Sequence, residues 1–232
     1  LVSVSANATV PFTEDFTTTA NWSISTNTSD PLVAPTFNSS GGPDNSSYIS
    51  RTAPTLNSSG AIVRSILFRA QDEYDSNNGS SNGQFEGNWI ADGINRFSMF
   101  VRHSAPDPLS YFVRFATPSN SPAVSGEGFF SVQPNTWTKL SIDILTSNIK
   151  TSVADLDHQL TVEGPPAFFN STFSNVGHIQ VGVSLPANSG AAGPFVFYFD
   201  KAAIGVVPEP ATSLLPMAGA VFMMASRRRR AR

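Results

Sequence analysis

The sequence predicts an all-β protein, a two-sheet antiparallel β-sandwich followed by a single short C-terminal hydrophobic helix. Of the 232 residues, 40% are hydrophobic, 18 are Phe and only 13% are charged, so the chain can form a core and is not a disordered polypeptide. Ser, Thr and Asn are abundant; these residues compete with the backbone inside helices and suit short strands and turns. Apolar residues also alternate with polar ones in many segments, which is the period of a half-buried strand.

The strands are expected in the following order. Period-two alternation marks strands over 97–101, 140–144, 179–185 and 195–199. Further strands are expected near 11–17, 46–52, 61–70, 84–91, 109–117, 127–133 and 157–162. Clusters of turn residues separate them at 38–44, 76–83, 106–108 and 186–194. We find no amphipathic helix, no fixed-period repeat and no further domain boundary, so residues 9–206 are assigned to one sandwich domain.

The N-terminal residues 1–8 have the character of a signal-peptide remnant. Ala6-Asn7-Ala8 has the small-x-small pattern that a signal peptidase accepts, which places cleavage after Ala8. An ordinary polar N-terminal tail is the alternative interpretation.

The C-terminal residues 207–232 combine three unlike features. Pro208-Glu209-Pro210 can continue neither a strand nor a helix and predicts an extended spacer. An apolar segment of 16 residues follows over 211–226 and would be about 24 Å long as a helix. An ordinary membrane span needs roughly 20 residues, so this segment is short for one. A basic cluster closes the chain, and such clusters stay on the cytoplasmic side of a membrane; it comprises Arg227, Arg228, Arg229, Arg230 and Arg232.

These features in this order resemble the PEP-CTERM sorting signal of Gram-negative bacteria. The resemblance covers about the last 25 residues, through Val207–Thr212, Leu214–Ala225 and the Arg cluster. It implies that the chain is the substrate of an exosortase-type membrane transpeptidase, with a transient inner-membrane anchor and the sandwich on the periplasmic side. Cleavage near the motif would then deliver the domain to the outer envelope or extracellular matrix. A tail-anchored protein with a Pro-rich stalk is the alternative.

The two ends of the predicted sandwich resemble jelly-roll lectins and carbohydrate-binding modules. The chain opens with Phe12-Thr13-Glu14-Asp15-Phe16 and closes with Phe197–Ile204. The resemblance implies that the first and last strands are neighbours, and that acidic residues at their ends hold a structural calcium ion. The residues concerned are Glu14, Asp15, Asp44 and Asp200. The spacing of Asp75 and Glu86 is similar to an EF-hand loop, although an Asn-Gly turn explains it better because the Gly at position six is missing.

Trp89, Arg102 and Arg114 are candidate ligand-binding residues, because aromatic rings stack on sugars and guanidinium groups bind their oxygens. Arg102 and Arg114 flank the turn at 106–108 and share parity with Phe100 and Phe112, so one aromatic-basic face is conceivable. The alternatives are that the Trp residues, Trp89 and Trp137, pack in the core and that both arginines are ordinary surface residues.

Composition excludes several kinds of chemistry. Without Cys there are no disulfides, zinc thiolates or cysteine nucleophiles. A net charge of −3, which leaves 9 basic against 17 acidic residues outside the Arg cluster, argues against nucleic acid as a partner. The three His residues show no metal-binding spacing. We therefore expect an exported, non-enzymatic envelope or extracellular-matrix protein with polysaccharide as a partner; a secreted polysaccharide hydrolase and a structural protein without ligand are the alternatives.

Overall fold

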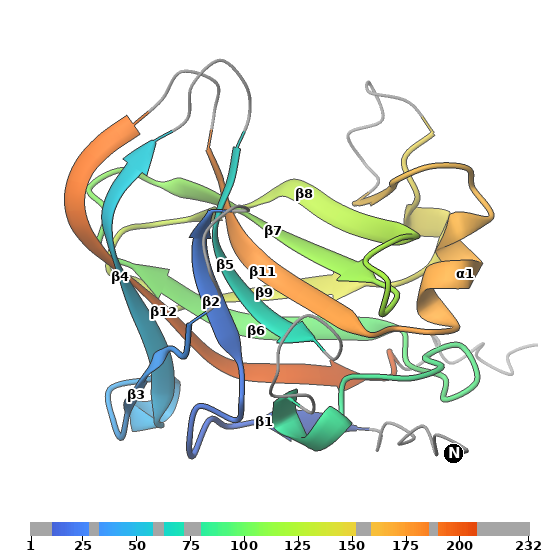
Figure 1. Ribbon diagram of the computed structural model, residues 1–232, viewed down its shortest axis with the longest axis horizontal. Coiled ribbons are helices and arrows are strands. Elements are labelled where there is room, and N and C mark those ends of the chain that lie inside the picture. Colours follow the sequence, from blue (N-terminus) through green and yellow to red (C-terminus); the bar gives the residue numbers. More distant parts are fainter. Residues whose placement is uncertain are drawn as a thin grey trace, which may run out of the picture.

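The computed structural model describes residues 11–27, 33–57, 63–71, 80–151, 159–185 and 190–207. These residues form two six-stranded antiparallel sheets that face each other (Figure 1). The predicted all-β sandwich of jelly-roll type is confirmed. Residues 1–10 and 208–232, and with them the expected signal remnant, sorting motif, hydrophobic helix and Arg cluster, lie outside the described residues.

The first sheet contains the last strand of the chain at its centre. Its order is β3 (Thr36–Asn38), β4 (Tyr48–Asn57), β12 (Gly190–Gly205), β6 (Arg96–His103) and β9 (Thr138–Asp143). The short β1 (Phe12–Glu14) also pairs with β12, with Phe12 opposite Ile204 and Glu14 opposite Ala202. The expected neighbourhood of the first and last strands is therefore confirmed.

The second sheet has the order β10 (Leu160–Val162), β8 (Ala123–Val132), β7 (Leu109–Ala116), β11 (His178–Leu185), β5 (Val63–Gln71) and β2 (Ser23–Asn27). The helix α1 (Phe168–Phe173) lies at one end of the sandwich, beside β7 and β8 (Figure 1). Short 3₁₀ turns complete the described elements: η1 (Pro43–Asn45), η2 (Ser80–Gly83) and η3 (Thr146–Asn148). In the described part of the chain, no helix is long and apolar enough to cross a membrane.

Aromatic rings fill the space between the sheets near α1. The ring of Phe115 on β7 lies 5.4 Å from Trp89, 5.6 Å from Phe97 on β6 and 5.4 Å from Phe173 on α1, measured between ring centroids. All four side chains are almost completely buried. One ring thus joins both sheets and the helix, and its burial contributes on the order of 2–3 kcal/mol.

The segment 84–91, predicted to be a strand, is instead a series of turns. Gly87 has a φ of +117°, which favours glycine, and the Asn88 side chain accepts a hydrogen bond from the Ala91 amide at 3.0 Å. Phe85 and Trp89 still point into the core, because the Trp89 indole donates to the Phe85 carbonyl oxygen at 3.0 Å. Phe85 and Trp89 therefore belong to the core without belonging to a sheet, whereas Ile90 of the same segment is exposed.

Two strands and one helix were missed by the sequence prediction. Strands β2 and β3 are short and lack regular apolar alternation. Helix α1 has six residues, fewer than two turns, and buries Phe169, Thr172 and Phe173. These three residues have the i, i+3, i+4 spacing of one helix face. Such a length is too short for a periodicity to be recognised in the sequence.

We expect Phe115→Ala to lower the free energy of unfolding by about 3–5 kcal/mol, because it removes the ring that contacts both sheets and leaves a cavity. Urea unfolding measured by near-UV circular dichroism would show the change. Phe37→Ala is the matched control: Phe37 is 39% exposed, so its loss should cost about 1 kcal/mol or less. Equal effects of the two variants would contradict the central position of Phe115.

Candidate functional site

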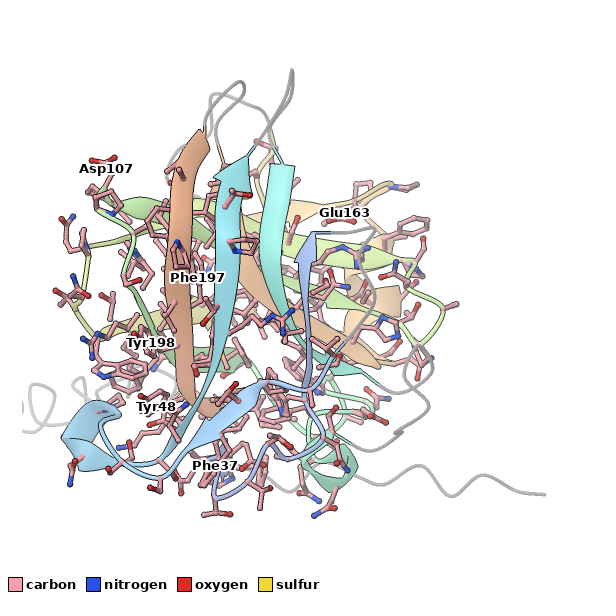
Figure 2. All side chains as sticks on the ribbon, turned by 60° about the vertical axis from the view of Figure 1, so that its left-hand side comes forward. Phe37, Tyr48, Asp107, Glu163, Phe197 and Tyr198 are labelled. Atoms are coloured by element: carbon pink, nitrogen blue, oxygen red, sulfur yellow. The ribbon has the colours of Figure 1, made fainter. Side chains whose placement is uncertain are left out.

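Three aromatic side chains gather on the outer face of the first sheet, and we call them the aromatic patch: Tyr48, Trp137 and Tyr198. Tyr48 begins β4, Tyr198 lies on the adjacent β12, and Trp137 immediately precedes β9. Their ring centroids are 5.6 Å apart for Tyr48–Tyr198, 5.7 Å for Tyr48–Trp137 and 6.1 Å for Trp137–Tyr198, all edge to face. Each ring is partly exposed. Figure 2 shows Tyr48 and Tyr198 close together.

The alternation of β12 determines which side chains reach this face. Phe195, Phe197 and Phe199 point into the core, so Tyr198 between them points outward. Hydrophobic burial of the three Phe side chains therefore fixes the orientation of Tyr198.

The loop before β4 supports the patch from one side. The Trp137 indole donates a hydrogen bond to the Gly41 carbonyl oxygen at 3.1 Å, across 96 residues of sequence. The Ser46 hydroxyl, in the same loop, lies within hydrogen-bond distance of both the Asp200 carboxylate and the Pro43 carbonyl oxygen, and its single proton is shared between these acceptors. The indole is thus held at a fixed orientation while part of its ring remains exposed.

Two basic side chains adjoin the patch. Arg102 on β6 lies opposite Tyr198, and its guanidinium carbon is 5.1 Å from the centre of that ring. Lys139 on β9 lies opposite Phe100, and its ammonium nitrogen is 5.9 Å from the centre of the Phe100 ring. Both are cation–π contacts, in which a positive charge lies over the electron-rich face of an aromatic ring.

Burial raises the pKa of the Tyr48 phenol, and the neighbouring Tyr198 adds to this, whereas the positive charge of Arg102 acts in the opposite direction. Tyr48 is therefore neutral at physiological pH. A neutral phenol can both donate and accept a hydrogen bond, as an uncharged hydroxyl-rich ligand requires.

The structure separates the three predicted ligand-binding residues. Trp89 is completely buried in the core, so it offers no ring face to a ligand. Arg102 lies beside the patch on the first sheet, whereas Arg114 lies on β7 of the second sheet. The proposed single aromatic-basic face does not exist, because the chain crosses from one sheet to the other at the turn between β6 and β7.

Arg114 is fully engaged in a buried network. Its side chain is held by Glu163, with Nε 3.0 Å from the nearer carboxylate oxygen, and by the side-chain and backbone oxygens of Asn120 at 2.6 and 2.9 Å. Figure 2 places Glu163 across the molecule from Tyr198. With only 8% of the residue exposed, Arg114 serves to hold β7 against its neighbouring loops.

The predicted calcium residues converge only in part. Asp200 is completely buried, and its carboxylate accepts hydrogen bonds from Ser46 and from the Lys201 amide. Asp44 instead faces the Lys201 ammonium at 2.9 Å, and Glu14 accepts a hydrogen bond from the Phe16 amide at 2.8 Å. Within the described ranges, no three His, Cys, Asp or Glu side chains form a group that could hold a metal ion. The calcium site stays a prediction; Asp75 lies outside the described residues.

The sequence analysis missed Tyr48 and Tyr198. The signal for Tyr198 was present, since it has the opposite parity to the three Phe residues around it. No pattern in the sequence predicts the contact between Tyr48 and Trp137, because the two residues are 89 positions apart. For Trp137 the sequence left core packing as the alternative interpretation, but the structure shows the side chain partly exposed.

Comparison with known proteins identifies no family. No family model matches the sequence, and no curated protein matches it. Among solved structures, the chain is similar to an exo-β-agarase, with a TM-score of 0.52 and 10% identity over 88% of this chain. The match covers 25% of the agarase, so this chain spans about a quarter of that protein. At this identity the similarity shows the fold alone, a β-sandwich.

Two further structures match at lower scores. A family 11 carbohydrate-binding module from Clostridium thermocellum, solved in complex with a β-1,3-1,4-mixed-linked tetrasaccharide, has a TM-score of 0.48 and 12% identity, covering 87% of this chain and all of that one (100%). The L4b domain of human laminin α-2 has a TM-score of 0.45 and 8% identity, covering 86% of this chain and 99% of that one.

Burial raises the pKa of Asp200 from 3.8 to about 6, against the opposing effects of its hydrogen bonds from Ser46 and Lys201. Since the folded state binds this proton more tightly than the unfolded state, the contribution of Asp200 favours folding below about pH 3.8 and is lost as the pH rises through about 6. We expect Asp200→Asn to gain up to about 3 kcal/mol in stability relative to wild type between pH 3.5 and pH 7.5. Urea unfolding in EDTA measures this gain, and a difference that does not change with pH would contradict it.

Proposed function

We propose that the chain is an exported, non-enzymatic protein of the cell envelope or extracellular matrix, and that its aromatic patch binds glycan. The observation that carries this proposal is the grouping of Tyr48, Trp137 and Tyr198 on an open sheet face. Clustered, partly exposed aromatic rings are costly to leave facing water, and their faces complement the C–H-rich faces of pyranose rings. The adjacent Arg102 and the phenol groups supply hydrogen bonds for sugar hydroxyls.

The hydrolase alternative requires two carboxyl groups that face each other across a groove, about 5–10 Å apart. Beside the aromatic patch, Asp200 is covered by the loop 41–46 and Asp44 is paired with Lys201. Asp143, on the same sheet, is paired with Arg96 at 2.6 Å. These three carboxyl groups are engaged in structural contacts, so they do not supply the pair that the hydrolase alternative requires beside the patch.

The sorting part of the proposal rests on the C-terminal resemblance. Strand β12 ends at Gly205, and the Val207 amide is tied to the Asn95 side chain, so Pro208 follows directly on a fixed point of the sandwich. The proposal requires that residues 208–210, which directly follow the last described residues, be accessible to an enzyme in the membrane. An exosortase-type transpeptidase and the inner membrane would then be transient partners.

Loss of the aromatic patch should weaken glycan binding. We expect Trp137→Ala and Tyr198→Ala each to raise the dissociation constant by about fivefold or more, since an aromatic contact contributes about 1 kcal/mol. The full chain is first screened on a glycan array with and without Ca²⁺, and the variants are then measured by affinity electrophoresis on the best ligand.

Phe37→Ala, which removes an exposed aromatic ring of the edge strand β3, is the matched control and should bind as wild type does. Absence of binding to every glycan would favour a purely structural role. Release of reducing sugar ends from a bound polysaccharide would favour the hydrolase.

Replacing Pro208, Glu209 and Pro210 together by Ala should leave the protein uncleaved in the inner membrane, because the processing enzyme would no longer find its motif. Fractionation and immunoblotting of the bacterium that makes the protein would measure this. Replacement of the exposed residues Pro106, Asp107 and Pro108 by Ala, in a turn of the sandwich, serves as the control. Normal processing of the triple variant would show that these residues are not the signal.

A further inference from the structure

We infer that the ligand of the aromatic patch is an acidic polysaccharide, whose uronic-acid carboxylates are bound by Arg102 and Lys139. The inference rests on the proposed function and specifies its ligand class.

The first observation is the unsatisfied state of Arg102. Its Nε is buried and has no hydrogen-bond partner, and the contact that the structure gives its guanidinium is the Tyr198 ring. A buried donor left without an acceptor costs about 1–3 kcal/mol. The rigid fork of an arginine matches a carboxylate through two parallel hydrogen bonds. A ligand carboxylate over the patch would accept hydrogen bonds from the two terminal nitrogens, because Nε itself is buried and out of its reach.

Three other basic side chains of the sandwich have acidic partners, although the Nε of Arg51 on β4 is, like that of Arg102, buried without a hydrogen-bond partner. Arg96, on the same strand and the same face as Arg102, lies 2.6 Å from Asp143. Arg114 lies 3.0 Å from Glu163 on the second sheet, and Lys201 lies 2.9 Å from Asp44. Arg102 thus differs from these three residues in charge environment, since no described carboxylate is paired with it.

The second cation lies on the same face. Phe100 and Arg102 are two residues apart on β6 and so share a face, and Lys139 is directly opposite Phe100 on β9. Lys139 is exposed, and within the described residues its recorded contact is the Phe100 ring. Two positive charges without acidic partners therefore border the aromatic rings.

The net charge of the chain opposes the binding of polyanions, so a local arrangement of cations has to overcome this repulsion. Outside the C-terminal Arg cluster, 17 acidic residues stand against 9 basic ones. A negatively charged protein repels polyanions over most of its surface, so an acidic ligand must be held by a specific local site. Aromatic rings bordered by unpaired cations meet this requirement. The rings stack on the faces of the sugars, and the cations donate hydrogen bonds to the carboxylates.

The test compares acidic polysaccharides with neutral forms of the same backbone. The full chain is titrated calorimetrically, in 50 mM salt, with polygalacturonate and with alginate, each also after chemical reduction of its carboxyl groups. We expect wild type to bind at least one polyuronate about tenfold or more tightly than its reduced form. In Arg102→Gln this ratio should fall close to one; Arg102→Lys should retain part of it, and Lys139→Gln should lower it.

Arg96→Gln is the matched control, because it removes an arginine from the same face that is already paired with Asp143; its preference should equal that of wild type. Equal affinity of wild type for the acidic and reduced forms would overturn the inference and leave glycan binding intact. Persistence of the preference in Arg102→Gln would also overturn it, as would equally effective competition by polyphosphate or single-stranded DNA. Binding to none of the four polysaccharides or the array glycans would overturn the proposed function itself.

Discussion

Strand β12 is the constraint on which the rest of the molecule depends. It pairs with β4 on one side and β6 on the other, and its last residues also pair with β1. Its inward residues, Phe195, Phe197 and Phe199, require a hydrophobic partner layer and thereby hold the second sheet against the first. Its outward residues place Tyr198 and the Asp200 carboxylate on the opposite side. One alternating segment therefore determines both the core and the candidate site.

Much of this fold could be predicted from the sequence, because a strand with one buried face shows a period of two. The strands containing Phe97, Ile142, Val181 and Phe197 were all found in this way. The strand predicted over 84–91 was wrong, because the buried residues of this segment reach the core from turns. An apolar residue that is buried does not by itself distinguish a turn from a strand. Short elements such as β3 gave too few residues for a pattern to emerge.

The candidate site could be predicted only in fragments. Arg102 was proposed as a ligand-binding residue and adjoins the patch, but Arg114, proposed with it, lies on the other sheet. Parity along one strand is encoded locally, whereas the order of strands in a sheet depends on contacts between distant segments. The meeting of Tyr48, Trp137 and Tyr198 depends on that order. The proposed preference for an acidic ligand likewise rests on which arginine lacks a carboxylate partner, and the spacing of charges along the chain does not reveal that.

The loop between β3 and β4 links the buried carboxylate to the surface of the patch. A side chain at Gly42 would bring its Cβ within 2.6 Å of Ser46 Oγ and 2.7 Å of an Asp200 oxygen, so the loop could no longer close. The adjacent Gly41 carbonyl is the oxygen that orients Trp137. A single substitution at position 42 would therefore disturb the packing around Asp200 and the orientation of the Trp137 indole together. These two properties are thus coupled through one loop, whereas Arg102 and Lys139 lie outside the loop and can vary independently of it.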